Sequence, residues 1–489
     1  MSEYRSRVPV GRAGFLALLR AEWTKLRSVR RWVLGIVGAV GLTILISLLT
    51  AAGSGSDLNK HPEELGAVGP NGLRVKDWFH FVHQQLSGDG SVIARVAAQE
   101  NSHEWAKAGV MIKESTEAGS SYAAVMVTPG NGVRLQSDFA ADLAGSVKAA
   151  PRWLRLTRNG DVITGYESAD GNAWTEVGRV ELASLPATAQ VGIFVTSPDE
   201  VVVEQQFGSA STGARPTMGT ATFDNVRVDP VERQELESWR DHDSSRGFVG
   251  GGDSSEIDGV FTVAGSGDIA VNPPDDDVAQ LSLIGITVGQ IALLAVSVLF
   301  ITSEYKRDLI RTTLAASPRR GRVLAAKAVV IGATTFVVGL IATVTAFLIT
   351  QPVLRSNGFG PPGYPLASLT EWPVLRAVVG GAVCLSLIAI FSLAAGTILR
   401  RSSGAITAGI VLFLAPILFS TALPLTVARG LVRVTPVAGF SITQTLPMDP
   451  NTAVEPWSMT GPLAGLGVLS AYAAVALIVA VWQIRRRDA

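Results

Sequence analysis

The residues of this chain that could do chemistry are scattered and form no catalytic pattern. Asp138, Asp142 and Glu167 could supply the two carboxylates that a glycosidase holds about 5–9.5 Å apart, but their spacing selects no pair. His80 and His83 are expected on a strand, where residues three apart face opposite sides, which argues against a metal site. The P-loop pattern for nucleotide phosphates is absent from the sequence. We therefore expect no enzyme activity and no bound metal or cofactor.

The charged segment 304–327 is the best candidate for a mechanical role. A helix from about 306 to 316, ended by Ser317-Pro318, would carry apolar residues on one side and cations on another. Such a surface could transmit force between a soluble motor and the neighbouring apolar segments. The alternative is a basic loop whose charges only orient the protein in a membrane. The apolar residues are Leu309, Ile310 and Leu314, and the cations are Lys306, Arg307 and Arg311.

Six apolar runs surround this segment, and they define the fold class. Each lacks an ionisable side chain over at least 19 residues. Each can cross a hydrocarbon core, which needs roughly 20 helical residues. We predict an α-helical polytopic membrane protein with six transmembrane helices. The runs are 32–52, 278–303, 328–353, 377–399, 402–428 and 456–484.

The spans themselves argue against an ion-coupled secondary transporter, which usually needs ionisable groups within its helices. Their best polar residue is Gln290, which would bond to a neighbouring helix or else contact a substrate. Pro416 and Pro424 should kink the fifth span.

The charge distribution predicts the orientation. The stretches 1–31, 304–327, 400–401 and 485–489 hold 20 cations and five acids, whereas 53–277 holds 17 cations and 33 acids. Short basic loops stay in the cytoplasm, and a long domain translocates largely regardless of its charge. We therefore expect both termini inside and 53–277 outside. The Arg-, Ala- and Gly-rich composition suggests a bacterial plasma membrane.

The segment 11–30 reads as a basic amphipathic helix in the inner membrane interface. A solvated cytoplasmic helix is the alternative. The apolar positions at helical spacing are Phe15, Leu18, Leu19, Trp23 and Leu26.

The segment 58–228 reads as an all-β sandwich, because short apolar segments alternate with turn signals. Asn159-Gly160 and Asp170-Gly171 are strong two-residue hairpin signals. The stretch 229–277 has linker composition, with a possible returning strand at 261–269. The expected strands are 91–97, 107–113, 122–128, 132–137, 152–158, 161–167, 174–182, 190–196 and 222–228.

Three motifs of this domain resemble the concanavalin-like (laminin-G-like) jelly rolls of bacterial secreted proteins. They are Trp105 to Ile112, Trp153 to Arg158 and Ser168 to Trp174. The resemblance implies an inserted extracellular jelly roll but no particular function, since such domains bind sugars, bind proteins or fill space. Trp153 and Trp174 could form a sugar platform or could pack in the core.

The membrane part resembles the permease subunit of type 2 ABC exporters. The resemblance rests on six spans, the amphipathic first helix, and a loop after the second span that carries an acidic-aromatic pair and Pro-Arg-Arg before Lys327. It implies a separate ATP-binding subunit, dimerisation with itself or with a related permease, and no nucleic-acid partner. The ATPase-coupling residues would be Glu304, Tyr305, Arg307, Arg311, Thr312, Leu314, Pro318, Arg319 and Arg320.

The predicted organisation follows from these parts. A cytoplasmic N-terminus with the interfacial helix (1–31) leads into the first span (32–52), the outside sandwich (58–228) and its linker (229–277). The permease helices (278–484) and a cytoplasmic tail (485–489) complete the chain. The alternative function is a non-transporting, membrane-anchored binder or sensor whose sandwich recognises an envelope glycan.

Overall fold

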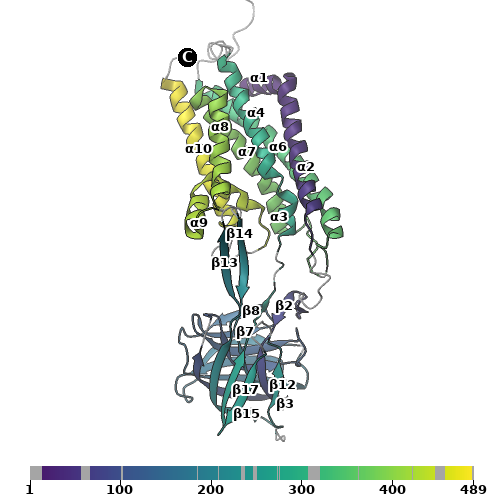
Figure 1. Cartoon of the computed structure of the whole chain (residues 1–489), viewed down its shortest axis with the longest axis vertical. Helices are drawn as coiled ribbons and strands as arrows, with labels where there is room; N and C mark the ends of the chain where they lie inside the picture. The colour runs from purple at the N-terminus through teal and green to yellow at the C-terminus, as the bar shows by residue number, and fades with distance from the viewer. Residues whose placement is uncertain are drawn as a thin grey trace, which may run out of the picture. The chain divides into compact units, whose positions relative to one another are not determined.

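The structure is a computed structural model, and it divides the chain into two units (Figure 1). The helical unit comprises 1–59, 203–211 and 274–489, and the β unit comprises 60–202 and 212–273. The structure describes residues 14–56, 66–100, 103–183, 185–206, 209–232, 237–245, 251–272, 274, 276–306, 320–361, 363–420, 422–446 and 458–486.

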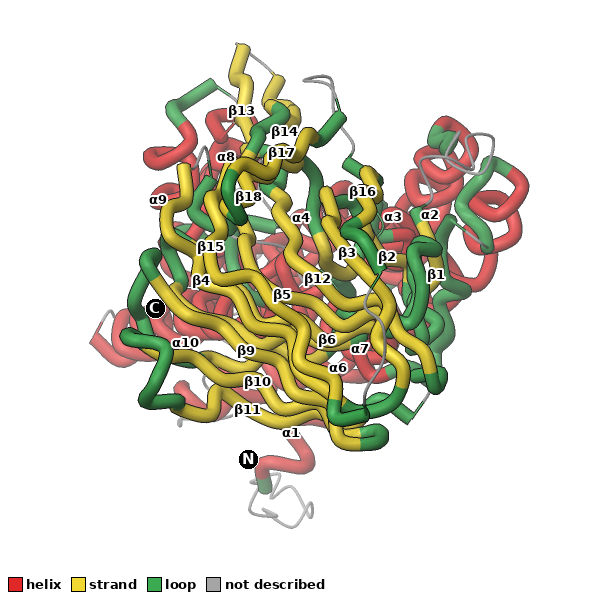
Figure 2. Tube along the Cα trace, turned by 90° about the horizontal axis from the view of Figure 1, so that it is seen from below, coloured by secondary structure: helices red, strands yellow, loops and turns green. Residues whose placement is uncertain are grey.

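The β unit is a sandwich of two seven-stranded antiparallel sheets, whose strands Figure 2 shows in yellow. Alternate residues of each strand point into a shared apolar core that includes Val110, Val125, Leu154 and Ile193. One sheet has the order β11 (Thr175–Glu181), β10 (Val162–Ser168), β9 (Arg152–Asn159), β4 (Gly90–Glu100), β15 (Gly219–Pro230), β18 (Val260–Gly265) and β17 (Asp253–Ile257). The other has the order β16 (Arg240–Asp243), β3 (His80–Ser87), β12 (Thr188–Thr196), β5 (Lys107–Lys113), β6 (Tyr122–Thr128), β7 (Gly132–Ser137) and β8 (Ala141–Ala144).

A small third sheet accompanies the sandwich. It consists of β1 (Ala67–Val68), β2 (Arg74–Asp77) and β19 (Ile269–Val271). Val75 of β2 and Ile269 of β19 share a second apolar cluster with Met111 and Phe194, which explains why these residues of the sandwich are fully buried on the side away from its main core. A separate two-stranded ribbon is formed by β13 (Glu200–Gln206) and β14 (Ser209–Arg215).

Each of the nine predicted strands is present, but the prediction of a linker over 229–277 is wrong. Four strands, β16 to β19, lie in that range and pair within the sheets. Within 261–269 the structure places β18, which pairs with β15 through Phe223↔Phe261. The polar, Gly-rich composition of the stretch misled the prediction because β16 and β17 are edge strands, where polar side chains are common.

The two predicted hairpins exist with different turns. In the β9–β10 hairpin Asn159 pairs with Val162, so the turn residues are Gly160 and Asp161, and only Gly160 has positive φ. The β10–β11 turn is longer than two residues: the carboxylate of Asp170 accepts backbone hydrogen bonds from Asn172 and Ala173.

The helical unit contains six helices that are long and apolar enough to cross a membrane, within the described residues. They begin with α2 (Arg30–Gly53) and continue with the pair α3 (Val278–Leu283) and α4 (Ile286–Lys306), which counts as one span. Then follow α6 (Arg320–Ser356), α7 (Trp372–Leu399), α8 (Ser402–Ser420) and α10 (Pro462–Arg486).

Glycines let α2 and α4 approach closely. A Cβ on Gly285 would lie 2.0 Å from the carbonyl oxygen of Thr43, and one on Gly289 would lie 1.9 Å from its hydroxyl. The amide of Gly285 donates a hydrogen bond to the hydroxyl of Ser47, 3.1 Å away. At the break between α3 and α4, this backbone amide therefore has a partner on the neighbouring helix α2.

The fifth span and the loop after it differ from prediction. The apolar run 402–428 does not form one kinked helix: α8 ends at Ser420, and Pro424 is the N-cap of a separate helix, α9 (Leu425–Val434). The 3₁₀ helix η2 (Pro436–Thr443) follows at a bend of 93° and is buried throughout. Together α9 and η2 are long and apolar enough to be a broken membrane span or a re-entrant segment.

Candidate functional site: a buried ionic cluster

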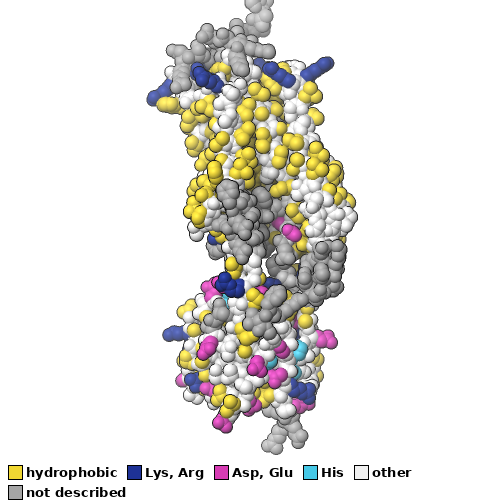
Figure 3. Space-filling model, viewed as in Figure 1, with side chains coloured by type: hydrophobic (Ala, Val, Ile, Leu, Met, Phe, Trp, Pro, Cys, Tyr) yellow, Lys and Arg dark blue, Asp and Glu magenta, His cyan; other side chains and the backbone are white. Residues whose placement is uncertain are grey.

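One end of the helical unit gathers most of its cations, and we call it the basic end. α1 (Phe15–Ser28) precedes α2 here, α4 ends here, α6 begins here and α10 ends here (Figure 1). Lys and Arg side chains are visible at this end in Figure 3. The guanidinium of Arg320 donates to the carbonyl oxygen of Ile484 at 3.3 Å, which ties the start of α6 to the end of α10.

Four charged side chains form an ionic cluster within the basic end. Lys327 of α6 donates to Glu22 of α1 and to Glu304 of α4, each at 2.6 Å. Lys25 of α1 donates to the same two carboxylates, at 2.9 Å to Glu22 and 3.1 Å to Glu304. Two cations and two carboxylates therefore alternate, and they join three helices that are far apart in the sequence.

The cluster lies in an apolar setting. Lys327 and Glu22 are only 1% and 2% exposed, and the ammonium of Lys327 lies 4.8 Å from the ring centroid of Phe300. Leu26, Phe300 and Leu324 pack around it. Burial lowers the pKa of Lys25, but the hydrogen bonds and charges of Glu22 and Glu304 outweigh it and raise that pKa overall.

The cluster can hold helices in register. Its two ammonium groups and two carboxylates are paired with one another. A buried ion pair adds little net stability, yet removing one partner leaves an uncompensated buried charge, at a cost of about 3–5 kcal/mol. The arrangement therefore favours one relative position of α1, α4 and α6 over sliding alternatives.

The structure places three of the nine predicted coupling residues at the basic end. Glu304 belongs to the ionic cluster. The guanidinium of Arg400 lies over the ring of Tyr305, 5.4 Å from the ring centroid. Arg320 contacts α10 as described above. The remaining six lie outside the described residues, as does the predicted helix 306–316 beyond Lys306: Arg307, Arg311, Thr312, Leu314, Pro318 and Arg319.

A helix is present within the segment 11–30 as α1, and its position in a membrane interface stays a prediction. Leu19 and Leu26 pack against the other helices, and Glu22 lies between them on the same face. Phe15 and Trp23 are 37% and 46% exposed. Trp23 directly follows Glu22, whose carboxylate bonds to Lys327, and consecutive residues of a helix do not share a face.

Gln290 is buried in α4, but its amide does not reach another helix. Its Nε2 donates to the carbonyl oxygen of Thr287 in the same helix at 3.0 Å. Its Oε1 has no hydrogen-bond partner among the described residues. The interhelical bond expected of this residue is therefore replaced by a bond within its own helix.

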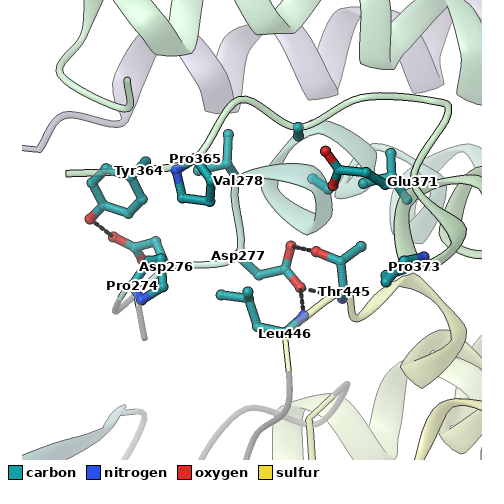
Figure 4. Close-up of a pocket in the computed structure, with 13 residues that line it drawn as sticks. Pro274, Asp276, Asp277, Val278, Tyr364, Pro365, Glu371, Pro373, Thr445 and Leu446 are labelled. Atoms are coloured by element: carbon teal, nitrogen blue, oxygen red, sulfur yellow. Dashed lines mark hydrogen bonds between the residues drawn. The ribbon is translucent and has the colours of Figure 1, made fainter. Parts of the chain in front are cut away.

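A second site lies at the opposite end of the helical unit, where a pocket of about 230 Å³ is lined by Asp276, Asp277 and Glu371. Asp277 caps α3 by accepting from the amide of Gln280, and it also accepts from the hydroxyl of Thr445 at 2.6 Å (Figure 4). Tyr364, also lining the pocket, donates to Asp276 at 3.3 Å. These bonds fasten the chain after η2 to the start of α3, so they have a structural role.

Sequence reasoning missed Glu22 and Lys25 as members of the site. A signal was present: Glu22 is the only acid in the segment 11–30, and it lies three residues after Leu19 and four before Leu26, on the same helix face. A carboxylate on a buried face needs a cation as its partner. Lys327, noted at the end of the charged segment, is the cation. What could not be read from the sequence was which acid of the chain it meets.

The carboxylates of the β unit that could have formed a glycosidase pair are engaged in structural bonds. Glu167 accepts from Arg152 at 3.0 Å and from Ser146, Asp142 accepts from Arg134 at 2.8 Å, and Asp138 accepts from Ser121. His80 bonds to Asp241 and His83 to Gln190. No group of three or more potential ligands among the described residues could hold a metal ion.

Trp153, which could form a sugar platform or pack in the core, lies on the outer face of its sheet, and Trp174 lies just before β11. Leu154 and Leu156 point into the core, so Trp153 and Arg155 point away from it. The guanidinium of Arg155 is stacked between Tyr166 and Trp174, at 4.4 and 4.5 Å from the ring centroids. Core packing therefore does not account for Trp153 and Trp174.

Three comparisons with known proteins were informative to different degrees, and the family match falls in the β unit. Residues 69–228 match the model of a family described as a protein of unknown function, DUF1349. No curated protein matches the chain. A structure of a functionally unknown protein from Saccharomyces cerevisiae is 18% identical, with 34% of this chain and 83% of that chain covered and a TM-score of 0.21. SCP-B of the eqolisin family of peptidases, solved with the tripeptide Ala-Ile-His, is 10% identical, with 38% and 98% covered and a TM-score of 0.25.

Proposed function

We propose that this chain is the membrane-spanning permease subunit of a type 2 ABC exporter. In this proposal the six long apolar helices cross a bacterial plasma membrane, the basic end faces the cytoplasm, and the β unit is an extracellular jelly roll. The chain forms the translocation path together with a second copy or a related permease. A separate subunit binds and hydrolyses ATP.

The observation that carries the proposal is the buried ionic cluster. Glu304 and Lys327 stand at the two ends of the charged segment 304–327. Lys327 is bonded to α1 through Glu22, and Glu304 is bonded to α1 through Lys25. A force applied to that segment or to α1 would thus reach α4 and α6 together. A loop that served only to orient the protein would need cations but no buried carboxylates bonded to them.

The experiment separates docking from transmission. The tagged full chain is purified from native membranes, its partners are identified by mass spectrometry, and ATP hydrolysis is measured in proteoliposomes. Arg311→Glu should abolish binding of the ATPase, because it reverses a charge on the proposed docking surface. Glu304→Gln should leave the ATPase bound but uncouple its activity from the permease, because it weakens the cluster.

Glu371→Gln is the matched control, since Glu371 is an exposed carboxylate at the other end of the unit. It should leave binding and coupling unchanged. Finding no ATPase with the unmodified chain, or full coupling in Glu304→Gln, would contradict the proposal.

A second candidate function is a membrane-anchored binder of an envelope glycan. The Arg155 stack with Tyr166 and Trp174 favours it, because half-buried aromatic rings on an outer sheet face suit sugar stacking. Co-purification distinguishes the two candidates, since an anchored binder has no ATPase partner. A permease with a glycan-binding outer domain would satisfy both.

A further inference from the structure

A second pocket opens at the basic end, beside the ionic cluster but lined by none of its four residues. It has a volume of about 260 Å³ and lies between α2, α4 and α8. α4 contributes Val296, Leu299 and Ser303, and the first residues of α2 and α8 contribute Arg31, Trp32 and Ser402. In Figure 1 α4 lies between α2 and α8, as expected for the floor of such a groove.

The lining changes from apolar to polar toward the basic end. Val296 and Leu299 come first along α4, and the hydroxyl of Ser303 follows just before the helix ends at Lys306. Seven residues of helix cover about 10 Å, which is the depth over which a bilayer passes from acyl chains to head groups. Leu299 is 41% exposed, whereas Val296 is 8% exposed, so Leu299 forms the open part of the apolar wall among the described residues.

The polar end of the pocket offers donors and positive charge. The guanidinium of Arg31 lies 5.4 Å from the ring centroid of Trp32. Trp32 is 7% exposed, and its indole Nε1 has no hydrogen-bond partner among the described residues. Arg401, which precedes Ser402, is exposed. Among the residues that the structure describes, no carboxylate lines this pocket, in contrast to the acidic pocket at the other end.

We propose that this pocket binds the phosphate head group of an anionic phospholipid, with an acyl chain along Val296 and Leu299. The inference rests on the proposed membrane embedding of the helices. Arg31 supplies the charge, Trp32 and the hydroxyls of Ser303 and Ser402 supply donors, and the apolar wall supplies contact area. A lipid fits the pocket better than a soluble anion because only a lipid also uses the apolar wall.

The test uses the purified full chain in detergent micelles without any ATPase. Phosphatidylglycerol and phosphatidylcholine with the same acyl chains are titrated, and bound lipid is counted by native mass spectrometry. Phosphatidylglycerol should bind more tightly. Arg31→Gln and Trp32→Phe should each weaken its binding about tenfold, as expected when a hydrogen bond to a charged group is lost.

The chain offers a matched control on α10. Arg486 lies 4.3 Å from the ring centroid of Trp482, so the same pair of residue types occurs outside the pocket. Arg486→Gln and Trp482→Phe should leave phosphatidylglycerol binding unchanged. A thermal-unfolding curve for each variant shows whether it is folded.

Three results would overturn the proposal. The first is equal affinity for the two lipids, or equal loss in the pocket and control variants. The second is competition by glycerol phosphate at the lipid's own concentration, which would identify a site for soluble anions. The third combines two observations: the unmodified chain binds no lipid, and a dimer of it dissociates on Arg31→Gln. This result would show that a second copy covers the pocket. None of them involves the ATPase, so the proposed function stands or falls separately.

Discussion

Glu22, Lys25, Glu304 and Lys327 show how buried charge can define the position of helices. Each carboxylate accepts from both ammonium groups, so no single pair can separate without exposing a charge to the apolar residues around it. Lys25 is 38% exposed and can reach water, but the side chains of Glu22, Glu304 and Lys327 are at most 7% exposed, so a charge left unpaired on one of these three is costly. The four residues thus act as one clamp across α1, α4 and α6.

Replacing Lys327 by Met should lower the stability of the helical unit by about 3–5 kcal/mol, because Glu22 and Glu304 would then be close, buried and short of a cation. Cys384 provides the measurement: it is the single cysteine of the chain and is fully buried in α7, so a thiol-reactive fluorophore labels it only on unfolding. Arg322→Met, which removes an exposed cation from the same helix, is the control and should change stability by less than about 1 kcal/mol. Equal melting temperatures for the two variants would refute the clamp.

His83 should make the β unit less stable in acid. Burial lowers its pKa below the usual value near 6.5, more than its hydrogen bond to Gln190 raises it. The unfolded chain therefore binds a proton more readily than the folded one. The stability contributed by neutral His83 is complete above about pH 6.5 and is lost as the pH falls from there through the lowered folded-state pKa.

The pH effect can be measured by denaturant unfolding of the fragment 60–273 between pH 7.5 and pH 5. His83→Gln retains a polar side chain but cannot titrate, so its stability should fall less over this range. Identical pH profiles for the fragment and its variant would contradict the assignment, since another group, such as His242, whose pKa is also lowered by burial, would then carry the dependence.

At the scale of elements, η2 is the most constrained segment of the helical unit. All eight of its residues are buried, although a 3₁₀ helix leaves more backbone groups without regular partners than an α-helix does. Such backbone is tolerated within a membrane protein only where protein surrounds it. α7 and α10 approach it through glycines: a Cβ on Gly380 would lie 2.2 Å from Ile442, and one on Gly465 would lie 1.9 Å from the carbonyl oxygen of Ala438.

Gly465→Ala should therefore destabilise the helical unit by about 1–3 kcal/mol, because the methyl group overlaps backbone that has no room to move. Gly467→Ala is the matched control two residues along α10, where nothing lies within 4 Å of the added carbon. It should be neutral or stabilising by up to about 1 kcal/mol, since Ala favours a helix. The Cys384 assay reports both, and a stable Gly465→Ala variant would show that η2 is loosely packed.

At the scale of the whole molecule, the chain builds two units with separate cores. The β unit is inserted between α2 and α3 and has its own apolar clusters, whereas the helical unit has others. The β unit contains no cysteine, so its stability cannot depend on disulfides. The four basic stretches would all lie on the same side of a membrane if the chain crossed it six times.

Cysteine labelling should establish the sidedness. In a Cys384→Ala background, an impermeant thiol reagent applied to whole cells should label Ala173→Cys, an exposed position in the β unit. Ser28→Cys, exposed at the end of α1, should be labelled only after the cells are opened. The opposite pattern would invert the orientation and remove the basis for an ATPase at the basic end.

The amino-acid sequence alone determined the features that depend on local composition. Runs without charge gave the six long helices, and apolar segments between turn residues gave nine strands of the sandwich, because burial of apolar surface acts on every such segment alike. Where the pattern was weaker, prediction failed: the edge strands β16 and β17 are polar, and the apolar run 402–428 concealed the end of α8 and the start of α9.

Tertiary structure alone decided which distant residues meet. The sequence shows that Glu22 is an acid in an apolar stripe and that Lys327 precedes a span, but the two are 305 positions apart and nothing in the intervening sequence indicates their contact. The same holds for the strand order of the two sheets and for η2 between α7 and α10. Such contacts depend on the complementary shapes and charges of surfaces that exist only after the helices and strands have packed together.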